Sequence, residues 1–231
     1  MHQYILSIFY CGTLATAAFP LIPQPTSVEP KNGAFALDGK WKIVAAGTSD
    51  FLTDQLSTGI KNLTGDVPSN STLDLGTIKL LINPQADANF AYTLTVSPEL
   101  VALDARDEAG VFYGIQTLLQ LIQPGAKEIP ACVIRDAPRF RWRGLMLDSS
   151  RHFQTVDEIK IFIDQMAHYK FNIFHWHLTD SPAWRIEIKK YPKLTSIGGR
   201  GNESDTSPEA PARFYTQEQI RGIVAYAKAR N

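Results

Sequence analysis

The first half of the chain alternates short apolar runs with one-sided helical stripes. Three runs bounded by turn residues predict strands at Trp41–Ala45, Ile78–Ile82 and Tyr92–Val96. Apolar residues at helical spacing predict helices over Asp50–Leu63 and about Ala109–Gln123. We expect the second helix to end before Gly125. Strands and helices in this arrangement predict a small α/β domain over residues 19–138.

Two extended segments lie at the ends of the predicted domain. Phe19–Pro30 is rich in proline and predicts an extended lead-in segment. Ile129–Pro138 has a strand-like composition, but Pro130 and Pro138 interrupt the pattern. We therefore interpret this second segment as a linker to whatever follows.

After Pro138 the pattern changes to alternating strands and helices. Gly144–Leu147 is a continuous apolar run, typical of a strand buried on both faces, and Asn172–Trp176 predicts the next strand. Capping boxes at Thr155–Glu158 and Thr216–Gln219 each open an amphipathic helix. The order strand, helix, strand, helix predicts right-handed crossovers and a parallel sheet.

These patterns predict an α/β fold in which the small N-terminal domain precedes the first part of an incomplete (β/α)8 TIM barrel at residues 139–231. Two strands cannot close a barrel of eight, so we expect unpaired strand edges and exposed apolar faces. We expect the chain to be truncated near the end of the second barrel helix. The alternative is a small sheet completed by the N-terminal strands.

Charge narrows the classes of partner. Lys and Arg number 23, and Asp and Glu also number 23, so no basic surplus favours nucleic acid or an acidic membrane. A neutral ligand such as a sugar fits this balance better than a polyanion. At 44% hydrophobic residues, the chain has enough apolar side chains for a sizeable core.

The N-terminus and several sequence motifs predict a secretory route. Residues 1–18 contain an apolar stretch that ends in small residues before Phe19-Pro20, which is typical of a cleaved signal peptide. The alternatives are a buried N-terminal helix and an uncleaved anchor. No later stretch is long and apolar enough for a membrane span. The candidate N-glycosylation acceptors are Asn62, Asn70 and Asn202.

Cysteine usage leaves one thiol in the mature chain. Cys11 falls within the predicted signal peptide, and Cys132 remains. An odd cysteine in a secreted protein is either free or paired with a residue outside this sequence. Missing C-terminal sequence would explain the second case.

The candidate chemistry lies where the two predicted barrel strands end, because catalytic groups of parallel barrels gather at that face. Arg151 can donate paired hydrogen bonds to sugar hydroxyls, or it can pair with Asp148 or Asp157 at the surface. Asp180 can orient a histidine or tune an acid, or it can cap the turn before Ser181-Pro182.

The two histidines that precede Asp180 allow a different chemistry. His175 and His177 share one face of their strand, and such a pair can bind zinc. No other clear ligand set follows, so histidines held by neighbouring carboxylates are the favoured interpretation. Trp184 either offers a platform for a sugar or covers the barrel rim, and rim packing is favoured.

The motifs RGLMLDSSRHF at Arg143–Phe153 and FHWHLTD at Phe174–Asp180 resemble the family 20 glycoside hydrolases, the β-N-acetylhexosaminidases. Three further stretches are also similar to that family: Asp107–Gly114 with Thr117–Gln120, Pro138–Phe140, and Tyr191–Thr195. The likeness covers most of the mature chain. One local departure is Ser181-Pro182, where many members have acidic and amide residues.

The resemblance implies an N-terminal α/β domain before a (β/α)8 barrel, and removal of terminal β-linked N-acetylglucosamine or N-acetylgalactosamine. In that family the acetamido oxygen of the substrate is the nucleophile, and no metal or other cofactor is used. Arg151 matches the arginine that holds the hydroxyls of the terminal sugar. Asp180 matches the aspartate that tunes the catalytic acid, and His177 has a supporting role.

The implied partners are oligosaccharide or glycoconjugate ends, without nucleic acid or a membrane span after signal cleavage. The implied location is the secretory pathway, ending outside the cell or in a lysosome or vacuole. A homo-oligomer of the full-length enzyme is compatible with the resemblance.

One family feature is missing. Family members carry an adjacent Asp-Glu pair at the end of a later strand, and this pair orients the acetamido group and supplies the general acid. The only Asp-Glu dipeptides here, Asp107-Glu108 and Asp157-Glu158, stand at predicted helix starts. We therefore expect the 231-residue chain to be inactive alone. The alternatives are a non-catalytic short form that binds or assembles with a partner, and a metal-dependent barrel hydrolase that uses His175 and His177.

Overall fold

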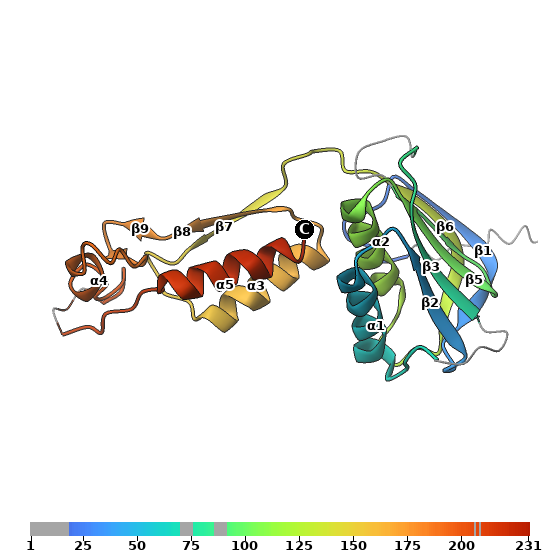
Figure 1. Cartoon of the computed structure of the whole chain (residues 1–231), viewed down its shortest axis with the longest axis horizontal. Helices are drawn as coiled ribbons and strands as arrows, with labels where there is room; N and C mark the ends of the chain where they lie inside the picture. Colours follow the sequence, from blue (N-terminus) through green and yellow to red (C-terminus); the bar gives the residue numbers. More distant parts are fainter. Residues whose placement is uncertain (1–18, 70–75, 86–91, 206, 208) are drawn as a thin grey trace, which may run out of the picture.

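The computed structural model describes residues 19–69, 76–85, 92–205, 207 and 209–231, and these form two units (Figure 1). The first, the sheet unit, contains six strands and two helices. The second, the β/α segment, begins at Gly144 and runs to the last residue. The predicted signal peptide, Cys11 and the acceptor Asn70 lie outside the described residues.

The sheet unit is built on one mixed sheet with the strand order β1-β6-β4-β5-β3-β2. β3 pairs in parallel with both β2 and β5, and the other three pairings are antiparallel. The strands are β1 (Ser27–Ala36), β2 (Trp41–Ala46), β3 (Gly76–Ile82), β4 (Tyr92–Val96), β5 (Leu100–Ala105) and β6 (Glu128–Asp136).

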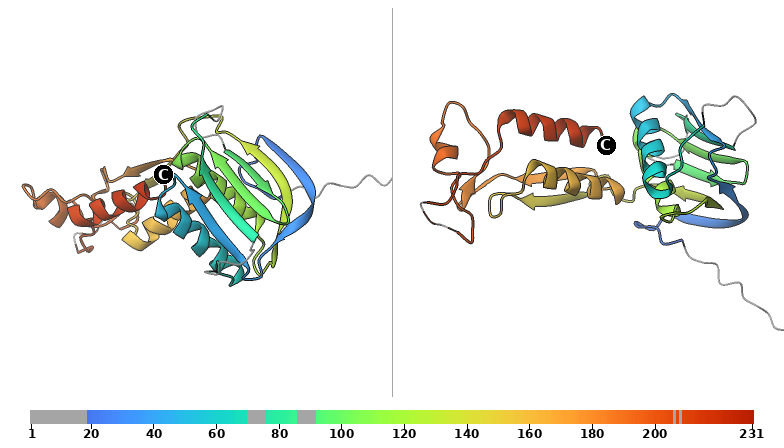
Figure 2. Two further views of the ribbon diagram at one scale, coloured as in Figure 1. Left: turned by 45° about the vertical axis from the view of Figure 1, so that its right-hand side comes forward. Right: turned by 90° about the horizontal axis from the view of Figure 1, so that it is seen from below.

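Helices α1 (Asp50–Thr64) and α2 (Glu108–Leu121) lie together on one face of this sheet (Figures 1 and 2). Alternate residues of β4 and β5, such as Leu94 and Leu103, are buried beneath them because strand side chains alternate between faces. Gly114 of α2 allows the helix to approach closely, since a Cβ there would lie 2.2 Å from the Leu103 side chain. The result is a continuous apolar core.

The predicted elements of this unit are confirmed, but three expectations were wrong or incomplete. The lead-in segment becomes the edge strand β1 from Ser27 onward, and the predicted linker is the inner strand β6. Pro130 is tolerated because β4 pairs only with Cys132–Asp136, beyond the proline. β5 was not predicted, since LVALDA has a single β-branched residue and no aromatic one to mark a strand.

The β/α segment contains a two-stranded parallel sheet made of β7 (Gly144–Asp148) and β8 (Ile173–His177). Helices α3 (Val156–His168) and α5 (Gln217–Lys228) contact one another and pack against one face of this sheet (Figure 1). Both predicted capping boxes are confirmed, at Thr155 and Thr216. The remaining elements are β9 (Thr179–Asp180), β10 (Ala183–Trp184) and the short helix α4 (Lys193–Ser196).

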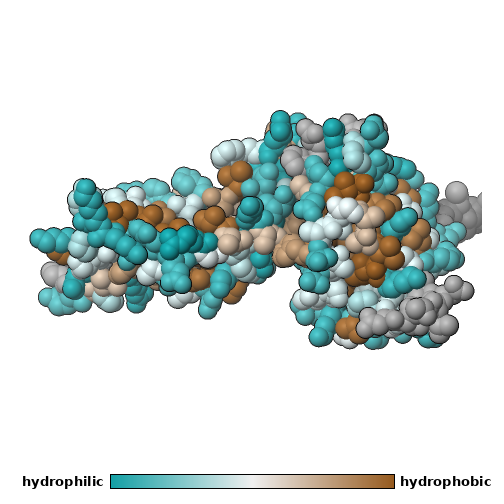
Figure 3. Space-filling model, in the orientation of Figure 1, coloured by the Kyte–Doolittle hydropathy of each residue, from teal (hydrophilic) through white to brown (hydrophobic). Residues whose placement is uncertain are grey.

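The prediction that Gly144–Leu147 is buried on both faces is wrong for the described chain. Met146 is 55% exposed because α3 and α5 cover only one face of β7 and β8. Leu145 alternates with it toward the helix face and is still 37% exposed. Apolar atoms are visible along this part of the surface in Figure 3. The alternative in which N-terminal strands complete the sheet is also wrong, since β7 and β8 pair only with each other among the described strands.

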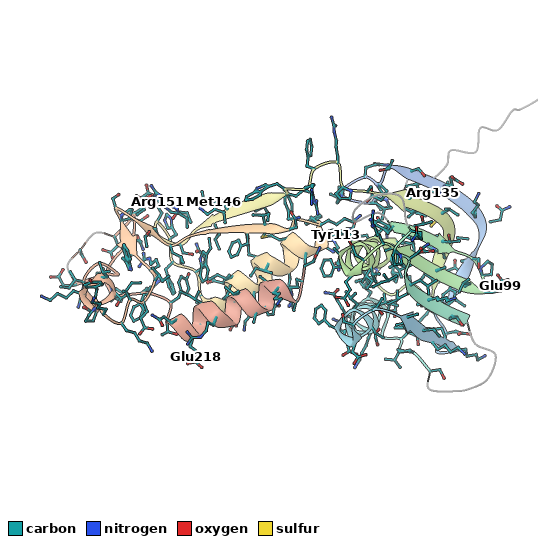
Figure 4. All side chains as sticks on the ribbon, turned by 45° about the horizontal axis from the view of Figure 1, so that its top comes forward. Glu99, Tyr113, Arg135, Met146, Arg151 and Glu218 are labelled. Atoms are coloured by element: carbon teal, nitrogen blue, oxygen red, sulfur yellow. The ribbon has the colours of Figure 1, made fainter. Side chains whose placement is uncertain are left out.

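A buried polar cluster joins the two units. Lys170, two residues after α3, has a positive φ of 63° and directs its ammonium to Tyr92 Oη at 2.9 Å and Asp136 Oδ2 at 3.1 Å. Burial lowers the pKa of Lys170, and the carboxylate of Asp136 opposes that shift. Arg143 donates to Tyr113 Oη of α2 at 2.7 Å, and Tyr113 is labelled at this junction in Figure 4.

No helix among the described residues combines the length and the apolar content needed to cross a bilayer.

Candidate active site

The register of β7 and β8 aligns the candidate residues in one row. Met146 lies opposite His175, and Asp148 lies opposite His177. The alternate residues Leu147 and Trp176 face the helices and pack against apolar side chains of α3 and α5 such as Ile163 and Ile223. The predicted shared face of the two histidines is therefore confirmed, and it is the face that α3 and α5 leave uncovered.

Arg151 stands at the centre of a polar network at the carboxyl ends of these strands. Its Nη1 lies 2.7 Å from Asp148 Oδ2 and 2.8 Å from Asp180 Oδ2. Its backbone N–H also donates to Asp148 Oδ1 at 3.1 Å. The Arg151 side chain remains 36% exposed, so this guanidinium is held by two carboxylates and is still open to a ligand.

Both uses expected for Asp180 occur together. Its Oδ2 lies 2.9 Å from His177 Nε2, and its Oδ1 accepts the backbone N–H of Ser181 at 2.7 Å. Asp157, the other partner considered for Arg151, pairs instead with Lys160 at 3.5 Å. The structure thus brings Arg151, His177 and Asp180 together, and it adds Asp148 as a member that the sequence reasoning had treated only as a surface partner.

The charges in this network reinforce one another. Burial alone would raise the pKa of Asp148, but hydrogen bonds and charge from Arg151 bring it below its ordinary value. The Ser181 N–H, His177 and Arg151 lower the pKa of Asp180, and Asp148 raises the pKa of Arg151. Both carboxylates are therefore ionised at neutral pH and cannot supply the proton of a general acid.

The strand-end loop that carries Arg151 is fixed by buried polar groups. Ser149 Oγ accepts from Trp176 Nε1 at 2.8 Å and from Tyr215 Oη at 3.1 Å, and it donates to Gln154 Oε1 at 2.7 Å. Sequence reasoning missed Ser149, Tyr215 and the buried Arg185. The signal for Arg185 was present: an arginine inside the run Ala183-Trp184-Arg185-Ile186 marks a charge within an apolar environment.

The structure also bears on the metal site and on the position of Trp184. Within the described part of the chain, no three residues with His, Cys, Asp or Glu side chains are grouped as metal ligands would be. Trp184 directs its indole N–H to the carbonyl of Ile186 at 2.7 Å, and its role at the rim stays a prediction.

Neither Asp-Glu dipeptide ends a barrel strand. Asp107 caps α2 by accepting from Gly110 N, and Glu158 belongs to the capping box of α3.

The candidate N-glycosylation sites and the remaining cysteine lie in different environments. Asn62 is exposed on α1, whereas the side-chain oxygen of Asn202 accepts backbone N–H groups from Ser204 and Asp205. Cys132 is a free, fully buried thiol in β6. Burial raises its pKa to about 11, so it is protonated and unreactive in the folded chain.

Two family models match the chain and divide it near the junction. Residues 18–137 match glycosyl hydrolase family 20, domain 2, and residues 140–231 match the catalytic domain of glycosyl hydrolase family 20. Among curated relatives, a beta-hexosaminidase of Vibrio furnissii is 39% identical and covers 93% of this chain. The alpha subunit of a mouse beta-hexosaminidase is 33% identical over 64% of it.

Solved structures agree with the observed fold. A family 20 exo β-N-acetylglucosaminidase from Vibrio harveyi, determined with N-acetylglucosamine, is 35% identical with a TM-score of 0.81 over 92% of this chain. A Streptomyces plicatus N-acetyl-β-hexosaminidase gives a TM-score of 0.78 at 34% identity. The predicted fold class, an N-terminal α/β domain followed by the start of a TIM barrel, is confirmed.

The chain spans only part of these relatives. It covers 36% of the Vibrio furnissii protein, 27% of the mouse subunit and 35% of the Vibrio harveyi structure.

Proposed function

The chain belongs to glycosyl hydrolase family 20, and from this premise we propose that it forms the N-terminal part of a β-N-acetylhexosaminidase. In this proposal residues 19–138 are the N-terminal domain and residues 139–231 begin the catalytic barrel. The observation that carries the proposal is the network of Asp148, Arg151, His177 and Asp180 at the carboxyl ends of β7 and β8. That position is where barrel enzymes bind and transform their substrates.

Arg151 is proposed to bind the terminal, non-reducing sugar. A guanidinium presents several N–H donors in one plane, and two adjacent sugar hydroxyls can accept from it. Asp148 and Asp180 hold this group in place before the ligand arrives, which reduces the ordering cost of binding. Because the two carboxylates leave no excess positive charge, the site suits a neutral sugar end of an oligosaccharide or glycoconjugate rather than an anionic one.

Asp180 and His177 are proposed to support the catalytic acid rather than to replace it. The 2.9 Å contact between them gives a relay through which an ionised carboxylate can orient a neighbouring group. A substrate-assisted reaction, in which the acetamido oxygen attacks the anomeric carbon, also requires an acid that protonates the leaving oxygen. The described residues offer no such acid at this face, so hydrolysis requires residues beyond those of this chain.

We place the protein in the secretory pathway, either secreted or delivered to a lysosome or vacuole. The composition of residues 1–18 supports this, as does the exposure of Asn62 as a glycosylation acceptor. No cofactor is required by the proposed chemistry.

The experiment compares Arg151→Met with Arg135→Met in the complete hydrolase that contains these residues. Arg135 is a suitable control because its exposed pair with Glu29 lies in the sheet unit, far from the barrel strands (Figure 4). Loss of charged hydrogen bonds to the sugar predicts a fall in kcat/KM of about 10- to 100-fold for Arg151→Met on a chromogenic N-acetylglucosaminide. Arg135→Met is expected to leave kcat/KM unchanged.

Two outcomes would contradict the proposal. One is an equal effect of both variants on kcat/KM. The other is turnover by the purified 231-residue chain itself, because no general acid has been placed in it. Sugar binding by this chain without turnover would fit the proposal, since Arg151 is present.

A further inference from the structure

Arg185 is a cation enclosed completely within the β/α segment. It is 0% exposed, and no carboxylate forms an ion pair with it among the described residues. A buried charge without a counter-ion is costly unless hydrogen bonds satisfy it. The proposed function gives this residue no role, so its retention inside the fold requires another explanation.

Backbone carbonyls satisfy every N–H donor of the Arg185 guanidinium. Nε donates to Ser149 O at 2.9 Å, and Nη2 donates to Ser150 O at 3.1 Å and Gly201 O at 2.7 Å. Nη1 donates to Gly199 O at 2.8 Å and Arg213 O at 3.0 Å. Five donors meet five acceptors, which is the full capacity of the side chain. One planar group thereby joins three separate stretches of chain.

Two of these three stretches adjoin Arg151. Ser149 and Ser150 are the two residues that precede it, and both of their carbonyls point to Arg185. On its other side, the carbonyl of Arg151 accepts the N–H of Glu203 at 3.1 Å, in the loop that Arg185 holds at Gly201. The backbone of Arg151 is thus restrained from both directions by contacts that lead to one guanidinium.

We propose that Arg185 is a positioning residue that fixes the backbone from which Arg151 extends toward the sugar. This inference rests on the proposed function of Arg151 as the sugar-binding arginine. Arg185 itself is buried and touches no ligand. Its effect on binding is transmitted through Ser149, Ser150 and the 199–203 loop, because a displacement of about 1 Å at a substrate-holding group is sufficient to weaken its contacts.

No other side chain type can make the same set of contacts. Lysine carries the same charge but has three donors on one atom, so at least two of the five carbonyls would lose their partner. Ser149 keeps its separate side-chain contacts with Trp176 and Tyr215. These contacts keep the loop attached when Arg185 is changed, so the variant is expected to fold while Arg151 loses its fixed position.

The matched pair of variants is Arg185→Lys and Arg143→Lys in the complete hydrolase. Arg143 also donates to backbone carbonyls, those of Lys170 and Phe140, but it does so at the opposite end of β7. Arg185→Lys is expected to raise KM about tenfold, with a smaller change in kcat per folded enzyme. Arg143→Lys is expected to lower thermal stability and leave KM unchanged.

A purely structural role predicts a different result. If Arg185 only stabilises the fold, its replacement reduces the folded fraction and the apparent kcat, while the KM of the remaining enzyme stays at the wild-type value. An unchanged KM for Arg185→Lys would therefore overturn the proposal, whatever happens to stability.

A second measurement separates this inference from the proposed function. In the 231-residue chain, the Nε–Hε NMR signal of Arg151 is expected to shift or broaden in Arg185→Lys and to stay in place in Arg143→Lys. If the wild-type hydrolase fails to cleave β-N-acetylhexosaminides, the proposed function is wrong, and this signal alone decides the positioning role. An Arg151 signal unchanged in Arg185→Lys would overturn that role.

Discussion

The sheet unit and the β/α segment contain the same kinds of element but are stabilised in different ways. In the sheet unit, six paired strands and two helices enclose an apolar core that includes Trp41, Leu103 and Ile115. In the β/α segment, two strands are covered on one face only, and polar side chains such as Ser149 and Arg185 fill the space where the strands end. Hydrophobic burial dominates the first, and directed hydrogen bonds organise the second.

This difference fits the function proposed for the β/α segment. An apolar core tolerates many side chains of similar volume, because burial has no direction. A site that binds a sugar needs groups held at defined angles, and hydrogen bonds provide that direction. The β/α segment therefore uses buried polar groups where the sheet unit uses aliphatic ones.

A large effect is expected where the two units meet. Lys170→Met leaves the carboxylate of Asp136, which is only 13% exposed, without its cation, and should lower the free energy of unfolding by about 3 kcal/mol. Lys160→Met removes an exposed pair with Asp157 and should lower it by less than about 1 kcal/mol. Urea denaturation of the 231-residue chain measures both. Similar losses in the two variants would show that the junction is not a buried electrostatic contact.

A matched pair of leucines tests the contrast in packing. Leu103→Ala opens a cavity in the closed core and should cost about 3 kcal/mol of unfolding free energy. Leu145→Ala, at a position that is 37% exposed on β7, should cost less than about 1 kcal/mol. Differential scanning calorimetry gives both values. Equal costs would mean that Leu145 is fully buried in solution, in contrast with the structure.

The smallest expected effect is a local change in the pKa values of two carboxyl groups. Asp148 and Asp180 have pKa values below their ordinary value of 3.8, so the stability from their charged form is complete above that pH and is lost as pH falls through the lowered pKa values. Arg151→Met should raise both carboxyl pKa values, measured by 13C NMR, and leave that of Glu29 unchanged.

Arg135→Met provides the reciprocal control for this titration. The side chains of Arg135 and Lys31 lower the pKa of Glu29 in the sheet unit. Replacement of Arg135 should raise the pKa of Glu29 and leave the pKa values of Asp148 and Asp180 unchanged. Crossed effects between the units would contradict the independence of the two charge clusters. High salt should reduce all of these shifts, since the groups are partly exposed.

The sequence was most informative where a local pattern decides a local structure. β4 was predicted with its observed bounds, and both capping boxes were found, because alternation and capping depend on neighbouring residues. Arg151, His177 and Asp180 could be selected because they follow apolar runs. The carboxylate that links Arg151 to the end of β7, Asp148, was underestimated, since its contact depends on how the loop folds back.

What the sequence could not provide was long-range pairing. β1 and β6 are separated by roughly one hundred residues and become strands by pairing with one another, and prolines in both obscured the pattern. The five acceptors of Arg185 come from residues 149 to 213, and all of them are loop carbonyls with no sequence signature. Such contacts are known only once the chain is folded.

The register between β7 and β8 constrains how this sequence can evolve. Asp148 stands beside His177 only because each strand carries its residues alternately to the open face and to the helices. A deletion of one residue inside either strand would exchange the two rows, placing Trp176 or Leu147 on the open face. Length changes are therefore tolerable in the surface loops and selected against within these ten positions, so divergence at this site should proceed by substitution rather than by insertion or deletion.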